Sequence, residues 1–156
     1  MKNKSPELTE KEALQKAMRI CSTQEKCTDD IIKKLHLWGI AIDKIEEIIN
    51  RLIEEKFIDN ERYTMFFVKD KFRLNKWGRV KIRYHLKQKG ISDEIINKSL
   101  QQISDEDYRE VLQYILEKKS KSLKAENEFD NKAKLIRYAE SKGFEIDEII
   151  SIAFDS

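Results

Sequence analysis

The sequence predicts an all-α protein of three tandem three-helix repeats that form an elongated, curved molecule. Apolar residues recur at helical spacing along nearly the whole chain, and the alternation typical of β-strands is absent. The 156 residues include only 4 Gly and 1 Pro. Sandwiches and barrels of β-strands need these residues at many turns, so the composition excludes such folds.

Three glycines mark the same position in each predicted repeat. Gly39, Gly90 and Gly143 are 51 and 53 residues apart, and each follows a small or aliphatic residue by four positions and precedes an apolar one. Positions eight and four before each glycine share one face of a helix. A glycine just past the end supplies the left-handed cap that stops the helix. Each repeat should therefore contain a helix, a capped turn and a second helix.

The remaining elements follow from this alignment. A further helix precedes each pair, at about residues 10–21, 60–72 and 105–118, and an Asp recurs where the helix after each glycine begins (Asp43, Asp93 and Asp147). We expect a first repeat with an N-terminal extension at residues 1–57, a central basic repeat at 58–103 and a third repeat at 104–156. The polar stretch 117–131, which carries a lysine cluster, is predicted to be a loop.

Charge is distributed unevenly along the chain. The 31 Lys+Arg and 29 Asp+Glu give a formal net charge of +2, yet residues 69–89 contain nine basic residues and one acid, Asp70. This segment, the basic segment below, carries +8 and the other 135 residues carry −6. A field of the whole molecule is excluded as a cause of binding, so any electrostatic attraction must be local.

The basic segment is the predicted binding surface. Its cations can neutralise phosphates while interleaved rings stack on bases, although the same cations would also suit an acidic protein surface. Arg79 and Lys81 follow Gly78 at the positive end of a predicted helix, an unfavourable position unless an anion comes there. The alternative is a solvated helix face around the core positions Ile82 and Leu86. The candidate binding residues are Lys69, Lys71, Arg73, Lys76, Trp77, Arg79, Lys81, Arg83, Tyr84, Lys87 and Lys89.

Other classes of function find little support. There is no Gly-rich phosphate loop, nucleophile elbow or pair of histidines on one helix face, so we expect no catalytic residue, cofactor or metal. Cys21 and Cys27 lack metal-ligand spacing and are interpreted as ordinary thiols in a reducing compartment. No apolar run is long enough for a membrane span and the start lacks an apolar signal region, which favours a cytoplasmic protein that binds no membrane.

Several stretches resemble the RecX family of bacterial recombinase regulators. The central match runs from Phe57 to Tyr63, through Phe66-Phe67-Val68, and then from Lys76 to Ile91. Looser matches are Ala13-Leu14 with Lys33-Lys34-Leu35, and Lys134 to Tyr138 with Lys142-Gly143-Phe144. The sequence departs from the family pattern at Trp77, where a small or basic residue is more usual, in the turn from Thr23 to Cys27, which commonly carries more Arg, and in its lower overall charge.

The resemblance implies a function. Members of the RecX family are tandem three-helix repeat proteins that bind the filament of RecA on DNA. They lie in the helical groove of the filament and inhibit strand exchange and ATP hydrolysis. We therefore expect a non-enzymatic, monomeric regulator of recombination and DNA repair, with a RecA-type recombinase filament and single- or double-stranded DNA as partners. Two alternatives stay open: an autonomous helical nucleic-acid-binding protein and a helical protein-interaction scaffold.

Overall fold

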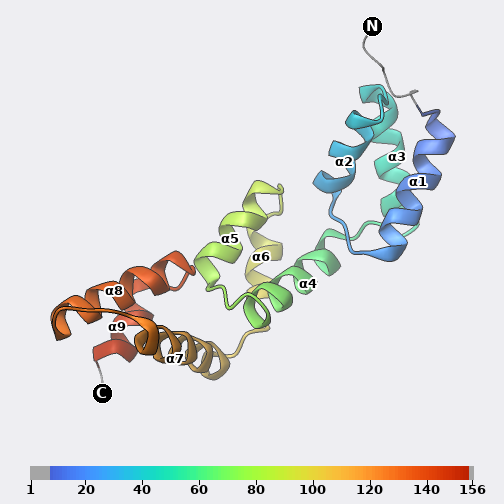
Figure 1. Cartoon of the computed structure of the whole chain (residues 1–156). Coiled ribbons are helices and arrows are strands. Elements are labelled where there is room, and N and C mark those ends of the chain that lie inside the picture. Colours follow the sequence, from blue (N-terminus) through green and yellow to red (C-terminus); the bar gives the residue numbers. More distant parts are fainter. Residues whose placement is uncertain (1–7, 155–156) are drawn as a thin grey trace, which may run out of the picture. The chain divides into compact units, whose positions relative to one another are not determined.

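The structure, a computed structural model, describes residues 8–154, and this part of the chain consists of nine α-helices without a β-strand (Figure 1). The predicted all-α fold of three-helix repeats is confirmed. Residues 1–7 of the predicted N-terminal extension and the last two residues of the third repeat lie outside the described residues. The helices are α1 (Glu10–Thr23), α2 (Thr28–Leu37), α3 (Ile42–Glu54), α4 (Asn60–Arg73), α5 (Arg79–Gln88), α6 (Asp93–Leu100), α7 (Asp105–Ser122), α8 (Glu128–Ser141) and α9 (Ile146–Phe154).

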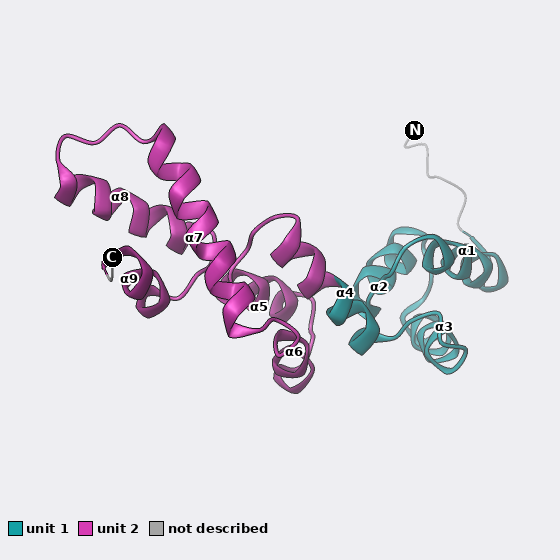
Figure 2. Cartoon of the chain, turned by 90° about the horizontal axis from the view of Figure 1, so that it is seen from below, with its two compact units in different colours: residues 1–66 teal, residues 67–156 magenta. Residues whose placement is uncertain are grey.

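The chain divides into two compact units, Met1–Phe66 and Phe67–Ser156 (Figure 2). The boundary falls inside α4, so the first unit contains α1–α3 and the start of α4, and the second contains the rest. The boundaries proposed for the three repeats, after residues 57 and 103, remain a prediction.

The three aligned glycines end α2, α5 and α8 in the same way. Gly39, Gly90 and Gly143 have positive φ values of 80°, 75° and 94°. In each case the N–H of the apolar residue after the glycine donates, at 3.1 Å, to the carbonyl oxygen of the residue four positions before the glycine. This is the Schellman arrangement, and it explains why the sequence repeats an apolar residue on each side of the turn.

In the first unit, α3 packs against both α1 and α2. The buried stripe of α3, three isoleucines and Leu52, faces Ala13 and Ala17 of α1, which are fully buried and let the helices approach closely. At the start of α4, the Asn60 side-chain oxygen accepts hydrogen bonds from the Thr28 N–H at 2.9 Å and the Thr28 hydroxyl at 3.3 Å. Asn60 thereby ties the first turn of α2 to the start of α4.

In the second unit, three aromatic rings join the central and third helix triplets. Phe72 of α4 stacks on Tyr108 of α7 with 6.0 Å between ring centroids, and Tyr108 also contacts Phe144 before α9 at 5.0 Å. All three side chains are buried. Because aromatic rings bury large apolar areas, this stack holds the end of α4 against both α7 and the turn that follows α8.

The stretch 117–131 is mostly helical, so its prediction as a loop is wrong. Helix α7 continues to Ser122 and α8 begins at Glu128, which leaves only residues 123–127 as a connection. The lysines of α7 are good helix formers, and the buried Leu112, Ile115 and Leu116 anchor the opposite side of the same helix. Asn127 starts α8 by accepting the Asp130 N–H at 2.8 Å.

Candidate nucleic-acid interface

The basic segment covers the end of α4, the connection 74–78 and the whole of α5, all in the second unit. Along α5, side chains four residues apart lie on one stripe. Ile82 and Leu86 form the buried stripe. The Lys and Arg residues of α5 and of its C-terminal cap therefore lie on two other stripes, which have different surroundings. Arg79, Arg83 and Lys87 form one, and Lys81 and Lys89, with His85 between them, form the other.

Arg79 is engaged within the protein. Its guanidinium donates to the Glu145 carboxylate at 3.0 Å and to Asp105 at 3.2 Å, and it lies 3.7 Å from the centroid of the Tyr108 ring. The Arg79 N–H donates to the Tyr108 hydroxyl at 3.0 Å, and that hydroxyl donates to Glu145. Burial by itself lowers the pKa of Arg79, but the hydrogen bond and charge of Glu145, with smaller contributions from Tyr108 and Asp105, raise it overall.

Because the Tyr108 hydroxyl is buried and hydrogen-bonded, we expect the free energy of unfolding to fall at alkaline pH. Burial, followed by the hydrogen bond to Glu145, raises the pKa of Tyr108 above its ordinary value of 10.0. The unfolded chain releases this proton near pH 10 and the folded chain retains it, so its stabilising contribution falls as pH rises, by at most about 1.4 kcal/mol per pH unit. Urea unfolding of the wild type and of Tyr108→Phe at several pH values tests this. The difference in unfolding free energy should shrink above about pH 10, whereas a constant difference would contradict it.

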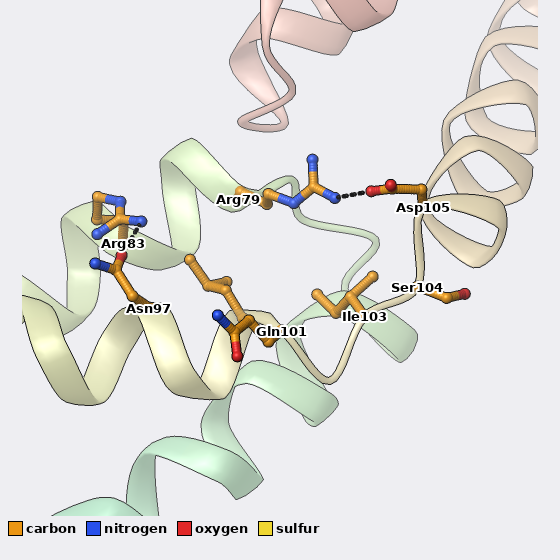
Figure 3. Close-up of a pocket in the computed structure, with 8 residues that line it drawn as sticks. Arg79, Arg83, Asn97, Gln101, Ile103, Ser104 and Asp105 are labelled. Carbon is orange, nitrogen blue, oxygen red and sulfur yellow. Dashed lines mark hydrogen bonds and ion pairs between the residues drawn. The ribbon is translucent and has the colours of Figure 1, made fainter.

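Arg83 and Lys87 also have partners within the protein. Arg83 donates to the Asn97 side-chain oxygen at 2.7 Å, and the Asp93 carboxylate lies 3.9 Å from Arg83 and 3.2 Å from Lys87. Figure 3 shows Arg79 and Asp105 on one side of an open pocket of about 540 Å³, and Arg83 beside Asn97 on the other. The stripe of Arg79, Arg83 and Lys87, which we name the outer stripe of α5, is thus largely neutralised by side chains of α6 and α7 and by Glu145.

Trp77 lies at the centre of a cluster on the other side of α5. The ammonium groups of Lys71 and Lys81 lie 5.0 Å and 4.7 Å from its ring centroid, the His85 ring lies at 4.7 Å, and Phe67 meets it edge-on at 6.4 Å. Cations are attracted to the face of an indole, so Trp77 holds two like charges close together. Its half-buried ring packs against side chains of α4 and α5 and holds the two lysines at the surface of the unit.

The start of α5 is capped by backbone from the turn after α8. The Gly78 N–H donates to the Lys142 carbonyl at 2.7 Å, and the Val80 N–H donates to the Gly143 carbonyl at 2.9 Å. These carbonyls, together with Glu145 beside Arg79, meet the free N–H groups and the positive end of the helix. The anion that the sequence predicted at this helix end is therefore supplied by the protein itself, and the end gives no support for an external ligand.

A different set of cations has no carboxylate partner. Within the described residues, Lys69, Lys71, Arg73, Lys76 and Lys81 form no ion pair, and we name them the unpaired cations. They surround the end of α4 and the connection 74–78. Lys142 adds to this charge: its ammonium donates to the Asn75 carbonyl at 2.7 Å, and burial together with the Lys81 charge lowers its pKa.

The other two candidates lie near the end of α5. Tyr84 is 58% exposed and meets His85 edge-on, with 5.5 Å between ring centroids, so one ring of the segment remains accessible for stacking. Lys89 follows the last residue of α5 as its C-terminal cap. The structure therefore gathers seven of the eleven candidates around α4 and the exposed side of α5, and it directs Arg79, Arg83 and Lys87 toward internal partners. The seven are Lys69, Lys71, Arg73, Lys76, Trp77, Lys81 and Tyr84.

Sequence reasoning missed the internal partners. Asp93, Asn97 and Asp105 follow the basic segment, and Glu145 comes from the far end of the chain; no local pattern links them to α5. In the part of the chain that the structure describes, no group of three or more His, Cys, Asp or Glu side chains is placed to hold a metal ion. In the same part of the chain, no helix is both long and apolar enough to cross a membrane.

Comparison with known proteins identifies the family. The family model described as "RecX, second three-helix domain" matches residues 59–100, and "RecX, third three-helix domain" matches residues 105–152. A "Regulatory protein RecX" of Caldanaerobacter subterraneus subsp. tengcongensis is 32% identical over 140 residues, which cover 89% of this chain and 68% of the relative. The chain belongs to the RecX family.

Other RecX proteins agree with this assignment. The "Regulatory protein RecX" of Clostridium tetani is 34% identical over 138 residues, 87% of this chain and 63% of the relative. The chain thus spans less than two thirds of the length of that relative. The crystal structure of RecX from Lactobacillus salivarius has a TM-score of 0.83 at 25% identity and covers 94% of this chain and 95% of the other. The two family domains coincide with α4–α6 and α7–α9, and the relatives are named regulatory proteins.

Proposed function

We propose that this protein is a non-enzymatic, monomeric, cytoplasmic regulator of recombination and DNA repair that binds the filament of a RecA-type recombinase on DNA. It modulates the ATPase and strand-exchange activities of that filament. Membership of a family whose relatives are named regulatory proteins supports the regulatory role. The observation that carries the DNA contact is the set of unpaired cations around the end of α4 and the connection 74–78.

The unpaired cations suit phosphate better than the outer stripe of α5 does. A cation that already contacts a carboxylate must weaken that ion pair before it can bind a phosphate, which offsets much of the gain. Lys71 and Lys81, held around Trp77, have no such pair to lose. Binding of these side chains to phosphates releases counterions, so the affinity should fall steeply with salt concentration.

The position of such a protein on the filament accounts for the inhibition of strand exchange and ATP hydrolysis. Cations on the second unit meet the phosphates of the DNA inside the filament, while the remaining helices contact the recombinase subunits that hold this DNA. Occupying that position hinders entry of a second DNA strand and movement of the subunits. The three repeats, with boundaries near residues 57 and 103, would then supply successive contact surfaces.

Two double variants with the same change of charge test the DNA contact. Lys71→Gln with Lys81→Gln removes two unpaired cations, and Arg83→Gln with Lys87→Gln removes two neutralised ones. We expect the first pair to raise the concentration needed to inhibit the recombinase ATPase about tenfold, and to reduce the salt slope of filament binding by about 2. The second pair should change inhibition by less than about threefold.

Circular dichroism checks that both double variants keep their helices. Equal losses of inhibition for the two pairs would show that total charge, and not the unpaired set, determines binding. Tight binding of the wild type to duplex DNA without recombinase, unchanged when recombinase is added, would instead favour an autonomous nucleic-acid-binding protein.

A further inference from the structure

A second aromatic ring on the surface of the second unit lies outside the basic segment. Tyr114 is on α7 and is 50% exposed. Two ammonium groups from different elements lie near its ring centroid, that of Lys76 at 5.8 Å and that of Lys118 at 5.9 Å. Lys76 belongs to the connection between α4 and α5, so the ring lies where the basic segment meets the third helix triplet.

Tyr114 has no role in the core of α7. The buried side of this helix is formed by Tyr108, Leu112, Ile115 and Leu116. Tyr108 is 1% exposed and its hydroxyl is bonded to Glu145, whereas half of the Tyr114 side chain remains open to solvent. Tyrosines that combine an exposed ring with neighbouring cations are the kind used to stack on bases.

The cations beside Tyr114 are available to an anion. Within the described residues neither Lys76 nor Lys118 forms an ion pair, and Lys76 is held in place by a left-handed backbone (φ 57°) and by donation of its ammonium to the Arg73 carbonyl at 2.7 Å. Lys121, two turns after Tyr114 on the same side of α7, is exposed. The nearest acid in sequence, Glu117, accepts a hydrogen bond from Gln113 at 3.2 Å.

We propose that Tyr114, Lys76 and Lys118 form a binding site for one nucleotide of single-stranded DNA, with a base stacked on the ring and the flanking phosphates on the two ammonium groups. The inference deepens the proposed function, since it names the strand form of the ligand and adds a side chain of the third helix triplet to the binding surface. A duplex does not fit this site equally well, because its bases are already stacked on one another. An acidic protein surface would use the cations but would not need the ring.

Direct binding of the full chain to a fluorescent oligothymidine, without recombinase, tests the site. Tyr114→Ala should weaken binding about tenfold, the loss expected for one base stacked on an aromatic ring, with little change in salt slope. Tyr114→Phe keeps the ring and should bind within about twofold of the wild type. Lys76→Gln with Lys118→Gln should reduce the salt slope by about 2. Phe129→Ala, which removes an 84% exposed ring elsewhere in the unit, is the matched control and should bind as the wild type does.

Each contrary result overturns the inference. The site is wrong if the wild type does not bind the strand, if Tyr114→Ala binds normally while its helices are intact, or if Tyr114→Phe weakens binding as much as Tyr114→Ala. Loss of filament inhibition without loss of oligothymidine binding would assign Tyr114 to a protein partner. The recombinase ATPase assay on the same variants separates the two proposals. If Tyr114→Ala binds the strand normally and still inhibits the ATPase, the nucleotide site is wrong but the regulatory function is not contradicted.

Discussion

Replacement of Gly143 by Ala is expected to lower the free energy of unfolding by about 3 kcal/mol. A Cβ at Gly143 would lie 2.3 Å from the Lys81 Cβ and 2.6 Å from the Lys81 backbone nitrogen, far inside van der Waals contact. The φ of 94° adds backbone strain for any residue with a side chain. Relief of the clash would move the turn away from α5 and break the hydrogen bonds that Gly78 and Val80 donate to it.

Gly90→Ala is the matched control for this prediction. Gly90 ends α5 as Gly143 ends α8, with a φ of 75°, but a Cβ there would meet nothing within 4 Å. Its cost should be limited to the strain of the left-handed conformation, about 1 kcal/mol. Urea unfolding followed by circular dichroism measures both variants. Equal losses would mean that the turn after α8 does not pack as closely on α5 as the structure has it.

Replacement of Glu145 by Ala should lower the free energy of unfolding by about 2–3 kcal/mol. The buried Tyr108 hydroxyl would lose its acceptor, and the half-buried Arg79 guanidinium would lose its closer carboxylate. Glu145→Gln should recover part of this loss, because an amide oxygen can still accept the Tyr108 hydrogen bond.

Asp105→Ala separates this internal contact from a surface ion pair. Asp105 also binds Arg79, at 3.2 Å, but its side chain is 86% exposed, so its removal should change stability by less than about 0.5 kcal/mol. Thermal unfolding of the three variants at neutral pH gives the comparison. An Asp105→Ala loss as large as that of Glu145→Ala would contradict the central role given to Glu145.

Much of the fold follows from local sequence features. The glycine alignment located the ends of α2, α5 and α8, because a Schellman turn places its requirements on neighbouring residues: Gly at the left-handed position and apolar residues on both sides. The long first helix of each triplet was predicted to begin where it does, at Glu10, Asn60 and Asp105. Polar composition misled the prediction after Glu117, since a lysine-rich helix whose other side is buried looks like a loop when only its charges are considered.

The division of the basic segment into paired and unpaired cations could not be predicted, because it depends on contacts with residues outside that segment. Nine cations in 21 residues predicted a positive surface, but the sequence could not show which of them meet acids. Arg79, Arg83 and Lys87 alternate with Lys81 along α5, yet helical geometry turns the first three toward Asp93, Asp105 and Glu145. Tyr114 carried only one local indication, a lysine four residues later, and its second cation comes from the connection before α5.

The capped start of α5 also bears on how the second unit folds. In many repeat proteins each repeat needs only its immediate neighbour and can form as soon as it has been synthesised. Here the first turn of α5 obtains its acceptors, and Arg79 its closer carboxylate, from residues 142–145, which follow α8. Until α8 and the turn after it have formed, the first turn of α5 lacks these acceptors. The helices from the end of α4 to α9 should therefore gain protection from hydrogen exchange together. Protection of the Gly78 and Val80 amides should show when the turn after α8 has packed on α5.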